Sequence, residues 1–404
     1  MEEIALLQGK TVVLGVTGGI AAYKMPNVAR MLKKMHCNVH VLMTQNATNF
    51  ITATTFETLT GNKCLIDTFD RNFEFSVEHV AIAKQADLVL VAPATANVIG
   101  KIANGIADDM LTTTIMACTC KKMIAPAMNH NMYHNSIVQE NIEKLKRHQY
   151  EIIEPVRGML ANGDTGDGKL PSEEELVNYV VRELAHEKDL AGKKILVTAG
   201  PTQEAIDPVR FITNHSTGKM GYAIAKMAML RGAEVTLVSG KTAIEPPMFV
   251  NVVPVVSAKD MFEAVKENAS EQDIIIKSAA VADYRPASVS DEKIKKTDGD
   301  AVIELERTDD ILAYLGQNKG STYLCGFSME TEHMLENSRG KLERKNLDMI
   351  VANNLKDKGA GFGTDTNLIT VITRKQEKQL ELMSKEAVAN CILDEIIKEI
   401  TATD

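Results

Sequence analysis

The sequence predicts an α/β protein of two domains, each with a doubly wound parallel sheet covered by helices on both faces. Short continuous apolar runs, typical of strands buried on both faces, alternate with amphipathic helical stretches. The same opening of strand, glycine turn and helix occurs twice, at 10–35 and again at 193–233. A length of 404 residues suits two or three domains of about 150 residues. We place the boundary near 186–192 and expect domains at 1–188 and 189–404.

The composition and charge argue against a nucleic-acid-binding, secreted or membrane protein. With 45 Lys and Arg against 54 Asp and Glu, the net charge of −9 argues against a nucleic-acid or anionic-membrane partner. The first 19 residues lack a basic region and become glycine-rich, so we expect no signal peptide. The longest apolar stretch, 88–107, is interrupted by Pro93 and Lys101, and no membrane span is expected. Six cysteines without metal-ligand spacing predict reduced thiols and a cytoplasmic protein.

The predicted elements follow one another in regular order. In the first half they are a strand at 10–15, a helix at 23–35, and strands at 39–44, 87–95 and 121–129. In the second half they are a strand at 193–202, a helix at 218–233, and strands at 234–240, 273–284 and 347–354. An amphipathic helix and a charged connector at 172–193 lie between the halves. Ligands of such sheets bind at the carboxyl ends of the strands.

The glycine turn at 15–24 predicts an anion site, because free backbone N–H groups and the helix dipole face a ligand there. The turn is not G-x-G-x-x-G, and the second strand ends in Thr44 rather than in an acidic residue. That combination favours a mononucleotide phosphate such as FMN over NAD. A plain tight turn is the alternative.

Further polar side chains stand near the strand ends of the first half. His79 begins a helix, Asn129 follows a strand, and the stretch 92–113 offers small and amide side chains against which a flat ring could lie. Each has a simpler reading, since a lone histidine is usually a surface or capping residue and an asparagine after a strand usually forms a turn. Their joint occurrence favours a site.

The segments GGIAAYK, VEHVAIAK, PAMNHNMY and GDTGDGKLP resemble the flavin-dependent cysteine decarboxylases. The whole chain resembles the bacterial bifunctional coenzyme A biosynthesis family, in which phosphopantothenoylcysteine decarboxylase is fused to phosphopantothenate–cysteine ligase. The resemblance implies two Rossmann-like domains, an N-terminal flavodoxin-like flavin domain and a C-terminal ligase domain. FMN would oxidise the substrate thiol to a thioaldehyde-like species, which then loses CO₂.

The resemblance also implies roles for particular residues. His79 is the general base, a role that suits an imidazole with an ordinary pKa of ~6.5. Asn129 binds the substrate carboxylate, and Met132 lines the same pocket. FMN would be bound by Gly18, Gly19, Ile20, Ala21, Thr44, Ala94, Thr95 and Asn97.

One departure from the family lies in the loop 158–172, where Asn162 replaces the cysteine that donates a proton to the enethiol product. An amide is not acidic near neutral pH. Another acid or a water delivers the proton, or Asn162 orients that donor, or this half stops at the oxidised enethiol. The retained glycine frame of the loop favours complete turnover. Cys118 and Cys120 are expected to be core residues.

The segment 198–221 is the most specific motif of the second half. A P-loop would require glycine at Thr213 and Ser or Thr at Met220, so that reading fails, but the lysine-bearing glycine turn still predicts an anion site. Arg210 and Asn214 lie in an insertion between strand and helix. The lysine run at 293–296 is either a solvated face or a triphosphate site.

Segments 325–331 and 339–354 complete the resemblance to the ligase, which implies CTP and a divalent metal, Mg²⁺ or Mn²⁺. Lys293 would stabilise the charge of an acyl-cytidylate, to which Asn214 hydrogen-bonds and whose pocket Arg210 shapes. Asp309 departs from the family's N-P-D-I, and Lys341 and Lys345 have the alternative of a solvated helix face. The CTP contacts would be Ala279, Asp283, Lys293, Asp309, Asp310, Ile311, Leu312, Phe327, Lys341 and Lys345.

We therefore expect an enzyme that turns 4′-phosphopantothenate, cysteine and CTP into 4′-phosphopantetheine. One alternative is an active ligase joined to a flavoprotein that only oxidises, because of Asn162. Another is a regulatory protein that keeps the flavin fold without turnover. The resemblance implies small-molecule substrates and a homo-oligomer, with trimeric flavin domains, dimeric ligase domains and a dodecamer that satisfies both.

Overall fold

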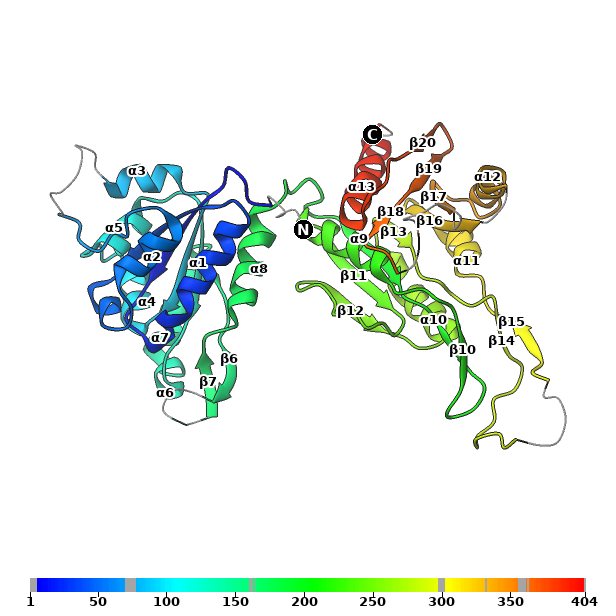
Figure 1. Ribbon diagram of the computed structural model, residues 1–404, viewed down its shortest axis with the longest axis horizontal. Helices are drawn as coiled ribbons and strands as arrows, with labels where there is room; N and C mark the ends of the chain where they lie inside the picture. The colour runs from blue at the N-terminus through cyan, green and yellow to red at the C-terminus, as the bar shows by residue number, and fades with distance from the viewer. Residues whose placement is uncertain are drawn as a thin grey trace. The chain divides into compact units, whose positions relative to one another are not determined.

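The protein consists of two compact units, Met1–His186 and Glu187–Asp404. The structure is a computed structural model that describes residues 6–69, 78–159, 163, 165–296, 302–330, 333–354, 361 and 363–402. Each unit is built on its own sheet (Figure 1).

The first unit contains a five-stranded parallel sheet in the order β2-β1-β3-β4-β5. Because the strand order reverses between β1 and β3, the loops after these strands leave on opposite faces, and the carboxyl edge between them is where ligands of such sheets bind. The bounds are β1 (Thr11–Val16), β2 (Asn38–Met43), β3 (Leu88–Ala94), β4 (Lys121–Pro126) and β5 (Glu151–Ile152).

Helices cover both faces of this sheet (Figure 1). The buried side chains of α3 (Glu78–Gln85), α4 (Ala96–Ala103), α5 (Met110–Ala117) and α7 (Ser136–Arg147) join one apolar cluster with Val13, Val89 and Val91 of the sheet. Helices α1 (Met25–Lys34) and α8 (Glu173–Leu184) contact each other and the sheet outside that cluster. The remaining elements are η1 (Ile20–Lys24), η2 (Gln45–Asn49), α2 (Ala53–Thr60), α6 (His130–Tyr133) and the hairpin β6 (Val156–Met159) and β7 (Thr165–Lys169).

The second unit contains an eight-stranded sheet in the order β12-β11-β8-β13-β16-β17-β19-β20. The first six run parallel and reverse order between β8 and β13, and β19 and β20 extend the sheet antiparallel. The bounds are β8 (Lys194–Ala199), β11 (Glu234–Ser239), β12 (Asn251–Pro254), β13 (Ile274–Lys277), β16 (Tyr323–Glu330), β17 (Met349–Asn354), β19 (Ile369–Thr373) and β20 (Glu377–Gln379).

The helices of the second unit again form two layers. Those that share an apolar cluster with the sheet are α10 (Ala258–Asn268), α11 (Ile311–Asn318) and α12 (Met334–Arg344). Helices α9 (Lys219–Leu230) and α13 (Lys385–Thr401) pack on each other. Short pairs are inserted as β9 (Gln203–Ala205) with β10 (Phe211–Thr213), β14 (Tyr284–Pro286) with β15 (Leu305–Arg307), and β18 (Thr366–Asn367) with β21 (Met383–Ser384); η3 (Ala269–Glu271) follows α10.

The predicted fold class, two doubly wound α/β domains, is confirmed. Two local expectations differ from the structure. The strand expected at 121–129 ends at Pro126, because residue 129 already caps α6. Cys118 is buried as expected, but Cys120 is only half-buried at the edge of the core. Among the described residues, no helix is long and apolar enough to cross a bilayer.

Candidate active sites

The loops at the carboxyl edge of the first unit's sheet are joined by Thr17, a buried residue directly after β1. Its hydroxyl donates to the carbonyl of Pro93 at 2.6 Å and accepts from the N–H of Thr95 at 3.1 Å. The loop after β1, with Gly18 and Gly19, is thereby held beside the loop after β3. The structure thus brings together two of the segments that the sequence assigns to a flavin.

Thr44 adds a third segment to this edge. Its hydroxyl oxygen is buried and has no hydrogen-bond partner, and leaving a buried polar group unsatisfied costs about 1–3 kcal/mol. A Cβ added at Gly18 would lie 2.5 Å from the Cβ of Asn46, so the loops after β1 and β2 touch and only glycine fits between them. The unpaired hydroxyl and the glycine-lined loop fit a phosphate group.

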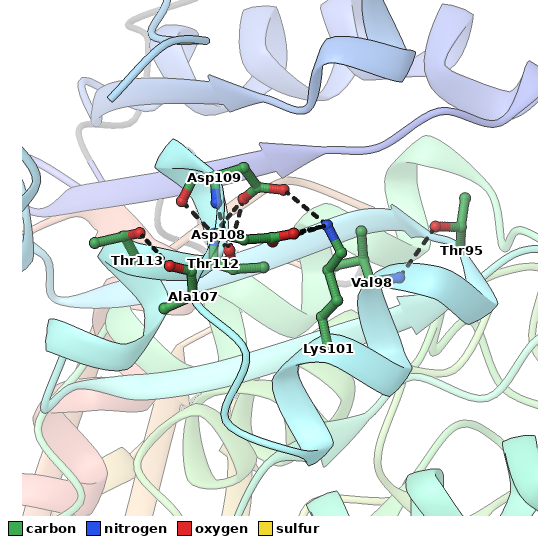
Figure 2. A network of polar contacts seen from close by, with 8 residues as sticks. All are labelled: Thr95, Val98, Lys101, Ala107, Asp108, Asp109, Thr112 and Thr113. Atoms are coloured by element: carbon green, nitrogen blue, oxygen red, sulfur yellow. Dashed lines mark hydrogen bonds and ion pairs between the residues drawn. The ribbon is translucent and has the colours of Figure 1, made fainter. Parts of the chain in front are cut away.

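The start of α4 is fixed by the polar network of Figure 2. The hydroxyl of Thr95 accepts from the N–H of Val98 at 3.4 Å and caps the helix. Lys101 donates to Asp108 at 2.8 Å, and this hydrogen bond raises the pKa of the lysine. The charge of Lys101 is therefore neutralised locally by Asp108. Of the other predicted flavin residues, Ala94 is buried, Ala21 is half-buried, and Ile20 and Asn97 are exposed.

The predicted decarboxylase residues that the structure describes lie on two separate elements. Asn129 caps α6, its side-chain oxygen accepting from the N–H of Asn131 at 2.9 Å, and Met132 on that helix is 49% exposed. His79 lies on α3, and α3 and α6 stand at opposite ends of the unit (Figure 1). Within one copy, His79 and Asn129 therefore lie on elements that are apart from each other. Asn162 lies outside the described residues.

Two cavities lie at the carboxyl edge of the second unit. The larger, of about 470 Å³, is lined by most of the residues predicted to bind CTP. The smaller, of about 140 Å³, is lined by Ala279 and by the start of α9, and Phe327 lines both cavities. The predicted residues that line the larger cavity are Asp283, Asp309, Asp310, Ile311, Leu312, Phe327, Lys341 and Lys345.

Opposite charges face each other in the larger cavity. Lys345 forms an ion pair with Asp310, whose other carboxylate oxygen accepts from the N–H of Ala313 at 2.9 Å and caps α11. Burial by itself would raise the pKa of Asp310, but the bonds from Lys345 and Ala313 outweigh it and hold the pKa below its usual value. Asp310 therefore stays ionised and positions Lys345.

Lys277 lines the same cavity and was not singled out in the sequence. It ends β13, and its ammonium donates to the carbonyl of Ala279 at 3.2 Å. Burial lowers its pKa to about 8, while the nearby Asp283 and Asp310 act in the opposite direction. The available signal was a single charge within the apolar run 274–281.

The smaller cavity meets the start of α9, where Gly218 adopts the left-handed conformation. The ammonium of Lys219 donates away to the carbonyl of Gly363 at 2.8 Å and to Asp365 at 2.7 Å. The expected anion site thus depends on backbone N–H groups. The side-chain oxygen of the buried Asn353, which lines this cavity, has no hydrogen-bond partner.

Three predicted ligase residues lie on neighbouring loops outside the lining of both cavities. The amide of Asn214 donates to the carbonyl of Ala280 at 2.7 Å and accepts from the N–H of Ser216 at 2.8 Å, so it joins two loops. Arg210 pairs with the buried Asp207 and donates to the carbonyl of Ile294 at 2.7 Å. Lys293, next to Ile294, is exposed.

Two units, each with a doubly wound sheet, define a two-domain α/β protein of the class whose ligands bind at the carboxyl ends of the strands. Family models agree, since residues 2–185 match the Flavoprotein model and residues 190–400 match the C-terminal domain of DNA/pantothenate metabolism flavoprotein. The chain is 48% identical over 395 residues to the coenzyme A biosynthesis bifunctional protein CoaBC of Bacillus subtilis strain 168, and 41% identical over 395 residues to that of Escherichia coli K12. Each comparison covers 97% of both chains.

The chain belongs to this CoaBC family of bifunctional coenzyme A biosynthesis proteins. A solved structure of the C-terminal domain of a coenzyme A biosynthesis bifunctional protein CoaBC is 46% identical and covers 54% of this chain and 100% of its own, with a TM-score of 0.47. The expected family is confirmed, and the first unit is a flavoprotein domain.

The unpaired hydroxyl of Thr44 yields a prediction. The substitution Thr44→Val removes a buried hydroxyl that has no hydrogen-bond partner, so the melting temperature of the flavin-free protein should stay unchanged or rise. The affinity for flavin should fall about tenfold or more, since a hydrogen bond to a charged group contributes about 1.5–3 kcal/mol. Thermal melts and titration of flavin fluorescence measure both. Thr58→Val, at an exposed position of α2, is the control; equal flavin affinity in both variants would contradict the assignment.

Proposed function

We propose that this protein makes 4′-phosphopantetheine from 4′-phosphopantothenate, cysteine and CTP. The second unit would ligate and the first unit would then decarboxylate the ligated product. The observation that carries the proposal is the charged cavity at the carboxyl edge of the second unit, which collects eight of the residues that the family resemblance assigns to CTP. Membership in a bifunctional coenzyme A biosynthesis family supports the same conclusion.

In the proposed ligation, the carboxylate of 4′-phosphopantothenate attacks the α-phosphate of CTP and pyrophosphate leaves. The amine of cysteine then attacks the acyl-cytidylate and CMP leaves. Because the first step brings two anions together, catalysis requires positioning and neutralisation of charge. Lys277, Lys341 and Lys345 supply cations to the cavity. Asp283 and Asp309 offer the carboxylate oxygens that Mg²⁺ prefers.

The smaller cavity suits 4′-phosphopantothenate, the substrate whose carboxylate attacks CTP. It adjoins the larger cavity at Phe327, so a carboxylate in one can reach a phosphate in the other. Backbone N–H groups at the start of α9 favour an anion, and Asn353 offers an acceptor to a hydroxyl or amide N–H. Asn214 would hold together the two loops that surround the acyl-cytidylate. Lys293, on the loop that Arg210 anchors, would reach the negative charge of this intermediate.

In the first unit, the loops after β1 and β2 would hold the phosphate of FMN, through the backbone at Gly18 and Gly19 and the hydroxyl of Thr44. Bound FMN supplies the two-electron oxidation of the substrate thiol. Asn129 would bind the substrate carboxylate. Since α3 and α6 are separated in one copy, we propose that His79 of a neighbouring copy accepts the thiol proton, in keeping with the implied trimer.

Product analysis tests the function directly. The purified chain should release pyrophosphate from CTP only when both 4′-phosphopantothenate and cysteine are present, and mass spectrometry should then find 4′-phosphopantetheine. Accumulation of the enethiol, which lacks two hydrogens, would limit the first unit to oxidative decarboxylation, as the Asn162 alternative holds. Failure to release pyrophosphate would contradict the ligase assignment.

Lys277 predicts a pH dependence of CTP binding. With a pKa of about 8, its charged fraction falls as pH rises through 8, whereas a bound triphosphate favours the charged form. The CTP affinity of the wild type should therefore decrease above pH 8, by up to about tenfold per pH unit. Lys277→Met should weaken binding at pH 7 about tenfold or more and remove this step. Calorimetry at pH 7, 8 and 9 measures the CTP affinity of the wild type and of both variants, and Lys259→Met, at an exposed position, is the control. The same change of affinity with pH in all three proteins would contradict the role of Lys277.

The shared decarboxylase site predicts complementation between inactive variants. His79→Ala and Asn129→Ala should each lack decarboxylase activity, but mixed and reassembled chains should recover about a quarter of the wild-type value, because one site in four combines the intact residues at random. Activity on phosphopantothenoylcysteine is measured after native mass spectrometry has verified mixed assemblies. His79→Ala mixed with the double variant should stay inactive. Verified mixed assemblies without recovery would place both residues in one copy.

A further inference from the structure

A cluster of two histidines and one aspartate lies beside Asn129 and consists of residues to which no role is assigned above. His130 and His134 belong to α6 and its C-terminal cap, and Asp167 belongs to β7. The carboxylate of Asp167 lies 3.0 Å from Nε2 of His134 and 3.9 Å from Nδ1 of His130. One ligand atom from each of the three residues lies within 4.8 Å of the others.

The backbone sets this juxtaposition. The spacing of four residues places both imidazoles on one side of a helical turn, and their ring centroids are 4.4 Å apart. Strand β7 is held against α6 by the N–H of Met128, which donates to the carbonyl of Gly168 at 3.0 Å. A Cβ at Gly168, with φ of +119°, would lie 2.2 Å from the Met128 carbonyl oxygen, and one at Gly166 would lie 2.9 Å from Cγ of His130. Glycines thus let the strand approach the helix closely enough for Asp167 to reach both histidines.

We propose that His130, His134 and Asp167 bind a divalent transition-metal ion of the Zn²⁺ or Co²⁺ class, with a fourth position open to water. Imidazole nitrogens and one carboxylate oxygen form a donor set that zinc takes, at about 2.0–2.2 Å, in sites with an open position. Ligands of a tetrahedral ion at those distances are about 3.4 Å apart, which lies between the two separations from Asp167. Two neutral imidazoles and one carboxylate leave a net negative charge for the cation.

The exposure of the three side chains to solvent and the nitrogen donors of the histidines both fit a transition-metal site. The three side chains are between 38% and 49% exposed, so an ion can enter from solvent. Nδ1 of His130 accepts from the N–H of Asp167 at 3.2 Å, so its lone pair faces the cluster, and an ion would replace this long hydrogen bond. Nitrogen donors favour Zn²⁺ or Co²⁺ over Mg²⁺ or Ca²⁺, which prefer oxygen. A bound ion would tie β7 to α6, directly after Asn129.

Metal titration of the full chain tests the proposal. Chelator-treated protein is titrated with Zn²⁺ by calorimetry and with Co²⁺ by visible absorption. One ion per chain should bind, and His134→Ala and Asp167→Asn should each weaken binding more than about 100-fold, since loss of an outer-shell partner already costs about 10–100-fold. His148→Ala, at an exposed histidine on the cap of α7, should bind like the wild type.

Amide hydrogen exchange gives a second readout that does not depend on activity. Zn²⁺ should slow exchange in 130–134 and 165–169 of the wild type and of His148→Ala, but not of Asp167→Asn. Unchanged affinity in both ligand variants, equal loss in His148→Ala, or a thiolate-to-cobalt absorption band that points to cysteine ligands would each overturn the proposal. In those cases the cluster is a hydrogen-bonded contact between the α6 segment and β7 and nothing more.

Discussion

In each unit, one buried threonine at the carboxyl edge of the sheet joins the segments that leave two neighbouring strands. At a switch point, the loops that follow two neighbouring strands leave towards opposite faces of the sheet. The backbone N–H and C=O groups just beyond the last hydrogen bond between the strands therefore lack a partner strand. In the first unit, Thr17 accepts from the N–H of Thr95 at 3.1 Å; in the second, Thr198 accepts from the N–H of Ala279 at 3.1 Å. Both threonines are fully buried. The same bridge therefore recurs at the same topological place, and the surrounding loops are positioned from it.

Around these equivalent bridges the two units present different electrostatics. At the carboxyl edge of the first sheet stand Gly18, Gly19 and the hydroxyl of Thr44, while the nearby charge of Lys101 is neutralised by Asp108. The second unit gathers lysines and aspartates in one cavity. A single phosphate ester can be held by neutral donors, whereas a triphosphate and the meeting of two anions require cations. The difference in lining fits the division of labour proposed for the two units.

Much of the fold was predictable because its signals are local. Continuous apolar strands, helical periodicity and glycine turns repeat in the order expected of doubly wound sheets. The predicted CTP segment 309–312 and Lys341 and Lys345 line one cavity, where Lys345 at the C-terminal cap of α12 pairs with Asp310 at the N-cap of α11. Lys277 escaped notice because a lysine within an apolar run reads as part of a strand, and only the enclosing loops show that it faces the cavity.

The sequence by itself determined the two sheets, their order along the chain and the chemical types of side chain at the strand ends, since these depend on period, on glycine and on charge within short segments. Only the tertiary structure decided which of those side chains meet. It separated His79 from Asn129 within one copy, directed Lys219 towards Asp365, and brought Asp167 to the histidines of α6. The reason is physical: contacts between distant segments follow from how helices and loops pack on the sheet, and no short stretch of sequence contains that information.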